Sequence, residues 1–236
     1  MASDQSRFAI HAAARDGRVN TVESLLNADP KLGKLKDDDG RLPIHWAASS
    51  NQHAIALLLV NQKGFDPDAQ DDSGWTPLMI AASVKDADAI VDLLLQKGAD
   101  INQTNNSGQT VMHFVSSKNN LELARKLLDQ KPPASVRARD KRGQYPLHRA
   151  AAVGSAPLVQ LLIKHKSPLN ATDSSGYTAL HHAVAEGHGD TAVALIKAGA
   201  DLDKKDLDGQ LALDLAPDKE VRKYIQRECE NEGIDL

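Results

Sequence analysis

Nine histidines are the residues of this chain best suited to chemistry, since an imidazole can bind a metal ion or transfer a proton near neutral pH. Five of them recur at one position of a repeating pattern: His11, His45, His113, His148 and His181. Equivalent side chains of stacked repeats lie about 10 Å apart, which is too far to share one metal ion. We therefore expect these imidazoles to be structural, each bonding the neighbouring turn.

Other signs of catalysis or cofactor binding are missing from the sequence. His181, His182 and His188 form a local cluster, in which a metal site is the alternative to a structural role. The chain carries no glycine-rich phosphate loop, HExxH pair, paired-cysteine motif or Gly-x-Ser-x-Gly elbow. We expect no enzyme activity, no catalytic residue, no metal and no cofactor.

The elements that position these side chains repeat every 33 to 35 residues, as the spacing of six glycines shows: Gly40, Gly74, Gly108, Gly143, Gly176 and Gly209. The clearest copy surrounds Gly74, which permits the positive φ angle of a tight turn. Thr76 can then cap a short helix with Pro77 at its first position, and Gly98 ends a second, leucine-rich helix. The pattern predicts a turn and two helices in each repeat.

A period of about 33 residues with this content resembles the ankyrin repeat. It implies an all-helical solenoid in one domain over residues 1–236, with seven helix-turn-helix repeats of which the two terminal ones act as polar caps. The expected repeats are 5–38, 39–71, 72–104, 105–140, 141–173, 174–206 and 207–229, followed by a frayed tail at 230–236. Function is then to be sought as recognition along one surface, which we expect to be concave.

Composition is consistent with a soluble monomer that binds protein. The chain is 41% hydrophobic, only 3% aromatic and 25% charged, with a net charge of −4, which disfavours generic binding to nucleic acid or membranes. Its longest clear apolar run, 54–60, is too short for a membrane span. Cys229 is the only cysteine, so we expect a reducing compartment, the cytoplasm and nucleus.

Residues that the repeat does not need mark the expected binding face, at turn tips and along the inner helices. The candidates for partner contact are Asp39, Arg41, Trp46, Asp71, Asp72, Trp75, Ile80, Lys118 and Arg149. Trp and Arg dominate binding hot spots, although Trp46 and Trp75 could instead fill the seam between repeats. Residues 66–108 hold eight acidic and two basic residues, whereas 119–166 hold three and ten. This asymmetry suits a partner with the reverse pattern, unless the basic residues merely solvate outer helices.

Several stretches go beyond generic repeats and resemble the gankyrin family of proteasome assembly chaperones. They are Asp39-Gly40-Arg41, His45-Trp46-Ala47, the run from Asp71 to Leu78, Ile80 to Ser83, Ser117-Lys118-Asn119 and His148 to Ala152. The resemblance implies a chaperone of the 26S regulatory-particle base that binds the C-terminal domain of one AAA ATPase subunit, the third of the ring. Arg41 and Lys118 would then meet acidic residues of the ATPase, and Asp39, Asp71 and Asp72 basic ones.

One departure limits what the resemblance implies. The animal proteins of that family carry a Leu-x-Cys-x-Glu motif for docking a retinoblastoma-type protein, and the aligned residues here are His182, Val184 and Glu186. That second function is not implied for this chain. The alternative to the chaperone is a generic adaptor for another signalling or transcriptional partner.

Overall fold

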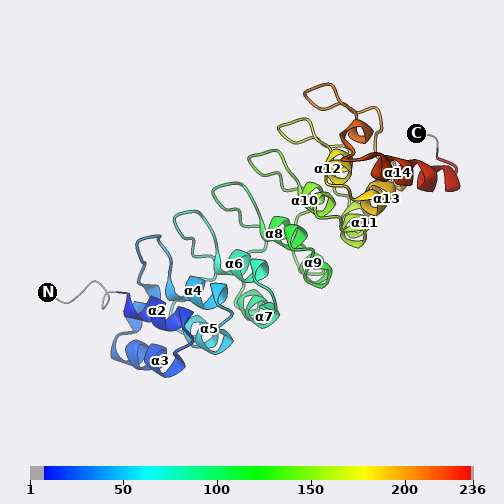
Figure 1. Ribbon diagram of the computed structural model, residues 1–236. Coiled ribbons are helices and arrows are strands. Elements are labelled where there is room, and N and C mark those ends of the chain that lie inside the picture. The colour runs from blue at the N-terminus through cyan, green and yellow to red at the C-terminus, as the bar shows by residue number, and fades with distance from the viewer. Residues whose placement is uncertain (1–7, 235–236) are drawn as a thin grey trace. The chain divides into compact units, whose positions relative to one another are not determined.

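The computed structural model describes residues 8–234 of the chain, and this part is helical (Figure 1). It contains thirteen α-helices, two 3₁₀-helices and one isolated antiparallel bridge between Lys205 and Leu211. None of the helices in these residues has the length and apolar character needed to cross a membrane. The chain divides into an N-terminal unit that ends at Asn106 and a C-terminal unit that begins at Ser107.

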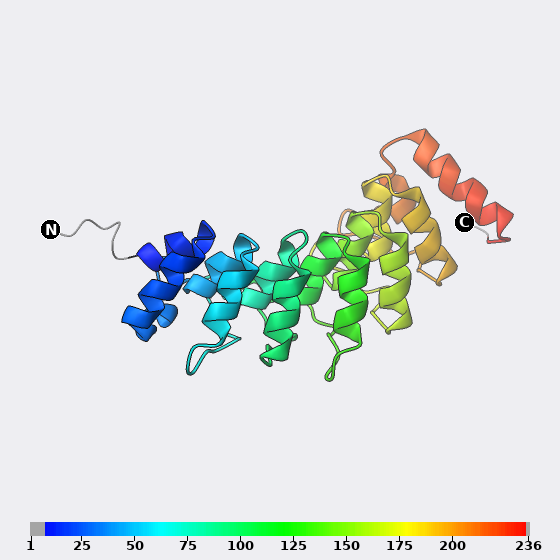
Figure 2. The same cartoon turned by 90° about the horizontal axis from the view of Figure 1, so that it is seen from below.

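The N-terminal unit consists of three helix pairs. They are α2 (Ala9–Arg15) with α3 (Val19–Ala28), α4 (Pro43–Ser49) with α5 (His53–Val60), and α6 (Pro77–Ser83) with α7 (Asp88–Gln96). The 3₁₀-helix η1 (Pro30–Lys34) follows α3. Helices α2, α4 and α6 pack in an inner row and α3, α5 and α7 in an outer row, with hairpin loops before α4 and α6 (Figures 1 and 2).

The C-terminal unit repeats this arrangement. Its elements are α8 (Val111–Ser117), α9 (Leu121–Leu128), α10 (Pro146–Ala152), α11 (Ala156–Lys164), α12 (Ala179–Ala185), α13 (Gly189–Lys197), η2 (Ala212–Leu215) and α14 (Lys219–Asn231). Helices α8, α10, α12 and η2 form the inner row, while α9, α11, α13 and α14 form the outer one. Hydrogen bonding continues past α14, since the N–H of Ile234 donates to the carbonyl of Cys229 at 2.9 Å. The fraying of the tail from residue 230 stays a prediction. Residues 235 and 236 lie outside the described part.

Local sequence explains where the inner helices begin. Pro43, Pro77 and Pro146 each occupy the first helical position, where the missing N–H breaks no bond. The predicted cap at Thr76 is confirmed, because its hydroxyl accepts the N–H of Met79 at 3.3 Å. Inner helices are only seven residues long and bury alanines such as Ala81, which lets neighbouring helices approach closely.

The predicted turn glycines are required for two reasons. Gly74 has φ +77°, and a Cβ there would lie 2.6 Å from the backbone N of Asn106 in the next loop. Gly176 has φ +81°, and its Cβ would lie 2.7 Å from the N of Leu207. Successive loops are also joined by backbone hydrogen bonds: the N–H of Asp72 donates to the carbonyl of Asp39 at 3.0 Å, and that of Leu207 to Ser175 at 3.2 Å. The glycine therefore supplies both the turn angle and the room for the adjoining loop.

The repeated histidines are structural, as predicted. His45 shows the arrangement: its Nδ1 accepts the N–H of Leu42 at 3.0 Å, so the ring proton lies on Nε2, which faces the carbonyls of Ala69 at 3.0 Å and Trp75 at 3.2 Å. Every ring except that of His11 thus ties the start of its helix to the following loop. The Nδ1 atom of His11 has no hydrogen-bond partner among the described residues. The Nε2 atoms of the other four face loop carbonyls in the same way, His11 with Leu35, His113 with Gln144, His148 with Ala171 and His181 with Gln210.

These buried imidazoles should make the fold sensitive to acid. Burial, followed by the neighbouring His182, lowers the pKa of His148 from 6.5 to about 4. Burial likewise lowers the pKa values of His45, His113 and His181. The unfolded chain then binds protons at a higher pH than the folded chain does, so stability falls as the pH drops below about 6.5.

We expect His148 alone to remove about 2 kcal/mol from the free energy of unfolding between about pH 7.5 and pH 5. Urea unfolding at the two pH values measures this change. His148→Gln lacks the titrating group, so its stability should depend less on pH than that of the wild type. An equal slope for both proteins would show that His148 titrates normally in the fold.

Candidate protein-binding surface

A cluster around Trp46 in the N-terminal unit gathers several of the predicted site residues. We call Arg15, Asp37, Arg41, Trp46 and Asp71 the Trp46 cluster. The indole N–H of Trp46 donates to Asp37 Oδ2 at 2.7 Å, and the guanidinium carbon of Arg41 lies 5.3 Å from the ring centroid. That of Arg15 lies 5.9 Å from it. The partly exposed indole therefore lies beside two cations. These contacts orient the side chains of Arg15 and Arg41 at the surface.

Asp71 has a role that the sequence did not predict. Its side chain is only 2% exposed, and Oδ1 accepts the N–H groups of Ser73 and Trp75, both at 2.9 Å. Oδ2 accepts a bond from Arg41 Nε at 3.2 Å. Asp71 thus shapes its own loop and holds Arg41, whose side chain is one third exposed. The carboxylate supports the surface and is not itself presented on it.

Two exposed carboxylates of this unit lie on the tips of adjacent loops. Asp39 and Asp72 are both exposed, and the backbone bond between them keeps the two loop tips together. Asp37 is half-buried beneath Asp39. Burial alone would raise the pKa of Asp37, but hydrogen bonds from Trp46 and from the N–H groups of Arg41 and Asp39 hold it below the usual value. The loops therefore carry a fixed negative charge next to Arg41.

A small cavity of 260 Å³ lies against this charge. Phe8, His11, Ala12 and Arg15 line it on the side of α2, and Trp46 with the three aspartates 37–39 lines the other. Arg15 was not among the site residues predicted from the sequence. The signal that could have found it is its place at the end of α2, the helix that packs on α4, which carries Trp46.

Two other candidates of this unit, Ile80 and Trp75, lie outside the Trp46 cluster. Ile80 is 7% exposed and packs within α6, so it contributes to the core. Trp75 is half-buried, and its carbonyl accepts the bond from His45. The exposure of Trp75 is intermediate, like that of Trp46, but of the two only Trp46 lines the 260 Å³ cavity. The contact of Trp75 with a partner stays a prediction.

In the C-terminal unit the two candidates differ from each other. Lys118 is exposed and follows the last turn of α8 as its C-cap. Arg149, on α10, is 23% exposed and donates to Asp140 Oδ2 at 3.0 Å. Lys118 is therefore free to move toward a partner, while Arg149 is held in place by a carboxylate that is only 1% exposed.

Loop aspartates three residues before the turn glycines explain this geometry. In the Asp140 loop, Oδ1 accepts the N–H groups of Arg142 and Gln144, while Oδ2 accepts from Arg149, nine residues further along the chain. Asp37 with Trp46 and Asp173 with His182 repeat this spacing. The Asp-x-x-Gly sequence, which recurs in these loops, could have indicated that these aspartates shape the turns. The loop aspartates thus position Trp46, Arg149 and His182 of the inner helices.

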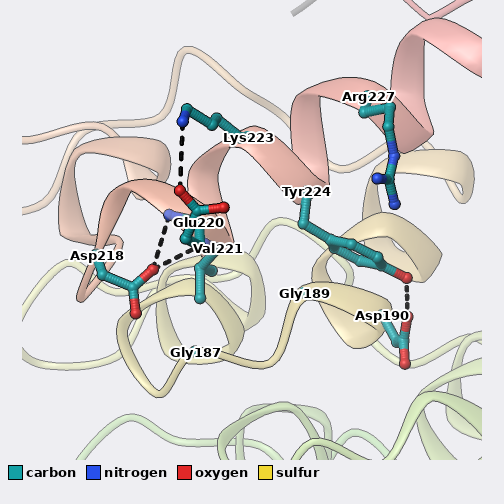
Figure 3. Close-up of a pocket in the computed structure, with 9 residues that line it drawn as sticks. All are labelled: Gly187, Gly189, Asp190, Asp218, Glu220, Val221, Lys223, Tyr224 and Arg227. Atoms are coloured by element: carbon teal, nitrogen blue, oxygen red, sulfur yellow. Dashed lines mark hydrogen bonds and ion pairs between the residues drawn. The ribbon is translucent and has the colours of Figure 1, made fainter.

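A cavity of 740 Å³ lies between the start of α13 and α14 (Figure 3). Its polar groups are mostly bonded to one another. The Tyr224 hydroxyl meets Asp190, Lys223 meets Glu220 at 3.3 Å, and Asp218 accepts the first N–H groups of α14. The pairing indicates a seam that holds the last helix in place. Cys229 of this helix is buried, and burial raises the pKa of its thiol, which disfavours the nucleophilic thiolate.

Comparison with known proteins supports a repeat scaffold. A family profile described as ankyrin repeats in three copies matches residues 2–71, 57–140 and 113–206. The crystal structure of the human ASB11 ankyrin repeat domain superposes with a TM-score of 0.80 at 22% identity, over 92% of this chain and 96% of that one.

The ankyrin repeat domain of Bcl-3, described as a unique member of the IkappaB protein family, gives 0.72 at 28% identity, over 92% and 97%. No curated relative matches the chain. The predicted all-helical solenoid is confirmed, while the number of repeats stays a prediction.

Proposed function

Because the chain belongs to the ankyrin-repeat family, whose domains are protein-interaction scaffolds, we propose that it is an assembly chaperone of the 26S proteasome base. Its proposed partner is the C-terminal domain of one proteasomal AAA ATPase subunit, the third of the base ring. The proposal includes a monomeric chain in the cytoplasm and nucleus that acts without catalysis. It rests on the resemblance to the gankyrin family at the residues of the loops and inner helices.

The Trp46 cluster is the observation that carries the proposal. Arg41, one of the residues shared with that family, is held by Asp71 on one side and lies beside Trp46 on the other. An arginine fixed in this way loses little side-chain entropy when it pairs with a partner carboxylate. Trp46 adds an aromatic surface of the kind found at hot spots.

Charge complementarity supplies the specificity in this proposal. Arg41 and Lys118 offer cations to acidic residues of the ATPase, and the exposed Asp39 and Asp72 offer carboxylates to basic ones. Complementary charges speed encounter and fix the register of two surfaces. Asp71 acts indirectly, by holding Arg41.

The alternative is an adaptor that presents the same residues to a different protein. A tagged copy of the chain, incubated with cell extract, separates the two. The chaperone should recover base precursors that contain the ATPase, and little mature 26S particle. Recovery of other proteins without any ATPase subunit would favour the adaptor.

Lys118→Glu tests the surface with little risk to the fold. We expect it to weaken binding to the purified ATPase subunit by about 1 to 3 kcal/mol, because an attraction becomes a repulsion. Melting temperature should hardly change, since Lys118 is exposed. Arg125→Glu on α9, whose side chain is 53% exposed, is the matched control and should bind normally. If calorimetry finds the two variants equally impaired, the inner row is not the binding face.

A further inference from the structure

The loop that contains Gly209 lacks a bond that the aspartates of four other loops make. Asp206 is 7% exposed, and its Oδ1 accepts the N–H groups of Asp208 and Gln210, both at 2.9 Å. Its Oδ2 has no hydrogen-bond partner among the described residues, although it is buried. The Oδ2 atoms of Asp37, Asp71, Asp140 and Asp173 each accept a side-chain donor.

Sequence explains the missing donor. In three of these loops the donor lies nine residues after the aspartate, and nine residues after Asp206 stands Leu215, which cannot donate. A second donor position lies about thirty residues before the aspartate. Arg41 donates to Asp71 from that position, and Gln144 donates to Asp173. For Asp206 that position holds Tyr177. A buried carboxylate without a donor is costly, and a nearby cation relieves that cost.

A groove of 570 Å³ lies at the loop that carries this carboxylate, lined by the two residues that follow Asp206. Its walls include Arg142, Gln144, Tyr177, His182, Leu207 and Asp208. Asp208 is exposed, and Leu207 is 77% exposed, the highest value among the large apolar side chains of the described residues. Burial, followed by the carboxylates of Asp206, Asp208 and Asp173, raises the pKa of Tyr177. Three negative charges therefore act on the space around the tyrosine ring.

We propose that this groove binds an arginine side chain of the protein partner, with its guanidinium between Asp208 and the Tyr177 ring, where the negative charge of buried Asp206 also acts. A planar guanidinium stacks on an aromatic ring and pairs with a carboxylate at the same time, which an ammonium does less well. Leu207 covers the aliphatic part of the arginine. Arg142, which also lines the groove, favours an acidic neighbour of the arginine.

The inference rests on the proposed function only in assigning the arginine to the same partner, so its first test uses the full chain without that partner. The probe is the blocked peptide acetyl-Ala-Arg-Ala-amide, followed by NMR at Tyr177, Leu207 and Asp208. We expect millimolar binding that shifts these signals. The same peptide with citrulline, which has the shape of arginine but no charge, should bind about tenfold more weakly. No shift, or equal shifts with both peptides, would overturn the inference.

Two variants locate the charge. Asp206→Asn keeps the Oδ1 acceptor, and Asn105 stands at the equivalent place of another loop, so the variant should fold. Asp208→Asn changes an exposed side chain. Each should weaken peptide binding about threefold or more, whereas Asp203→Asn, exposed on the same connection but outside the groove, should not. Unchanged binding in both groove variants would contradict the assignment.

The purified ATPase subunit supplies the last arm. If it binds the wild type, Asp208→Asn should raise its Kd about fivefold, and an unchanged Kd would overturn the assignment of the groove to this partner. If the ATPase does not bind while the arginine peptide does, the proposed function fails and the arginine site stands. The two failures are therefore distinguishable.

Discussion

Gly176→Ala is expected to lower the free energy of unfolding by about 2 to 5 kcal/mol, because two separate penalties add. The first is the left-handed turn angle, φ +81°, which disfavours any residue with a Cβ. The second is steric: the new Cβ would lie 2.7 Å from the backbone N of Leu207 and 2.9 Å from the Cα of Asp206, and backbone cannot move aside cheaply.

Gly209→Ala is the matched control, since the two glycines hold the same place in successive loops. Gly209 has φ +78°, but its Cβ would meet no atom within 4 Å. Only the angle penalty of about 1 to 2 kcal/mol applies there. Urea unfolding of the two variants separates angle from contact. Equal losses of stability would show that the approach of the next loop contributes nothing.

Arg41→Glu should cost the protein both stability and binding. The change removes the donor from Asp71, whose carboxylate is 2% exposed, and places a second negative charge against it. We expect unfolding to become easier by about 2 to 4 kcal/mol, somewhat less than for a fully buried pair because Arg41 is one third exposed. Association with the ATPase subunit should fall below detection in calorimetry.

A second change separates the two effects. Asp71→Asn retains the Oδ1 acceptor that shapes the loop and offers an amide donor to the new glutamate. The double variant Arg41→Glu with Asp71→Asn should therefore recover most of the stability and none of the binding. Recovery of both would mean that Arg41 acts only through the fold. Arg18→Glu, at an exposed pair with Asp16, is a control that should alter neither by much.

Features that depend on neighbours in sequence could be predicted. Pro77 at the first position of α6, Thr76 as its cap and the turn at Gly74 follow from local backbone chemistry, and all three are found. The structural use of the histidines was also predictable, because one position repeated along the chain cannot converge on a metal. The details of that use, Nδ1 on the helix start and Nε2 on the next loop, needed coordinates.

Features that depend on contacts between repeats could not be predicted from one sequence. Asp71 looked like a free acid at a turn tip, because its partner Arg41 lies thirty residues away. Arg15 lies beside Trp46 because α2 packs on α4, a contact between repeats that the sequence alone did not show. The turns between paired helices are also hard to predict from glycine alone. Asn51, Asp86 and Asn119 adopt the positive φ angle there, as Gly17, Gly154 and Gly187 do in other repeats. Short polar side chains tolerate that angle, so glycine alone does not mark it.

Among the described residues, one backbone hydrogen bond joins each pair of successive hairpin loops, so hydrogen exchange at a single amide reports when that pair separates. The amide hydrogens of Asp72, Ser174 and Leu207 each donate to one carbonyl of the preceding loop, Asp39, Arg142 and Ser175 respectively. An amide of this kind exchanges with deuterated solvent only when its two loops separate. The exchange rate of each amide then measures how often its own pair of loops separates. The order in which the array comes apart, and which contacts a bound partner holds closed, can thus be followed with one hydrogen per contact.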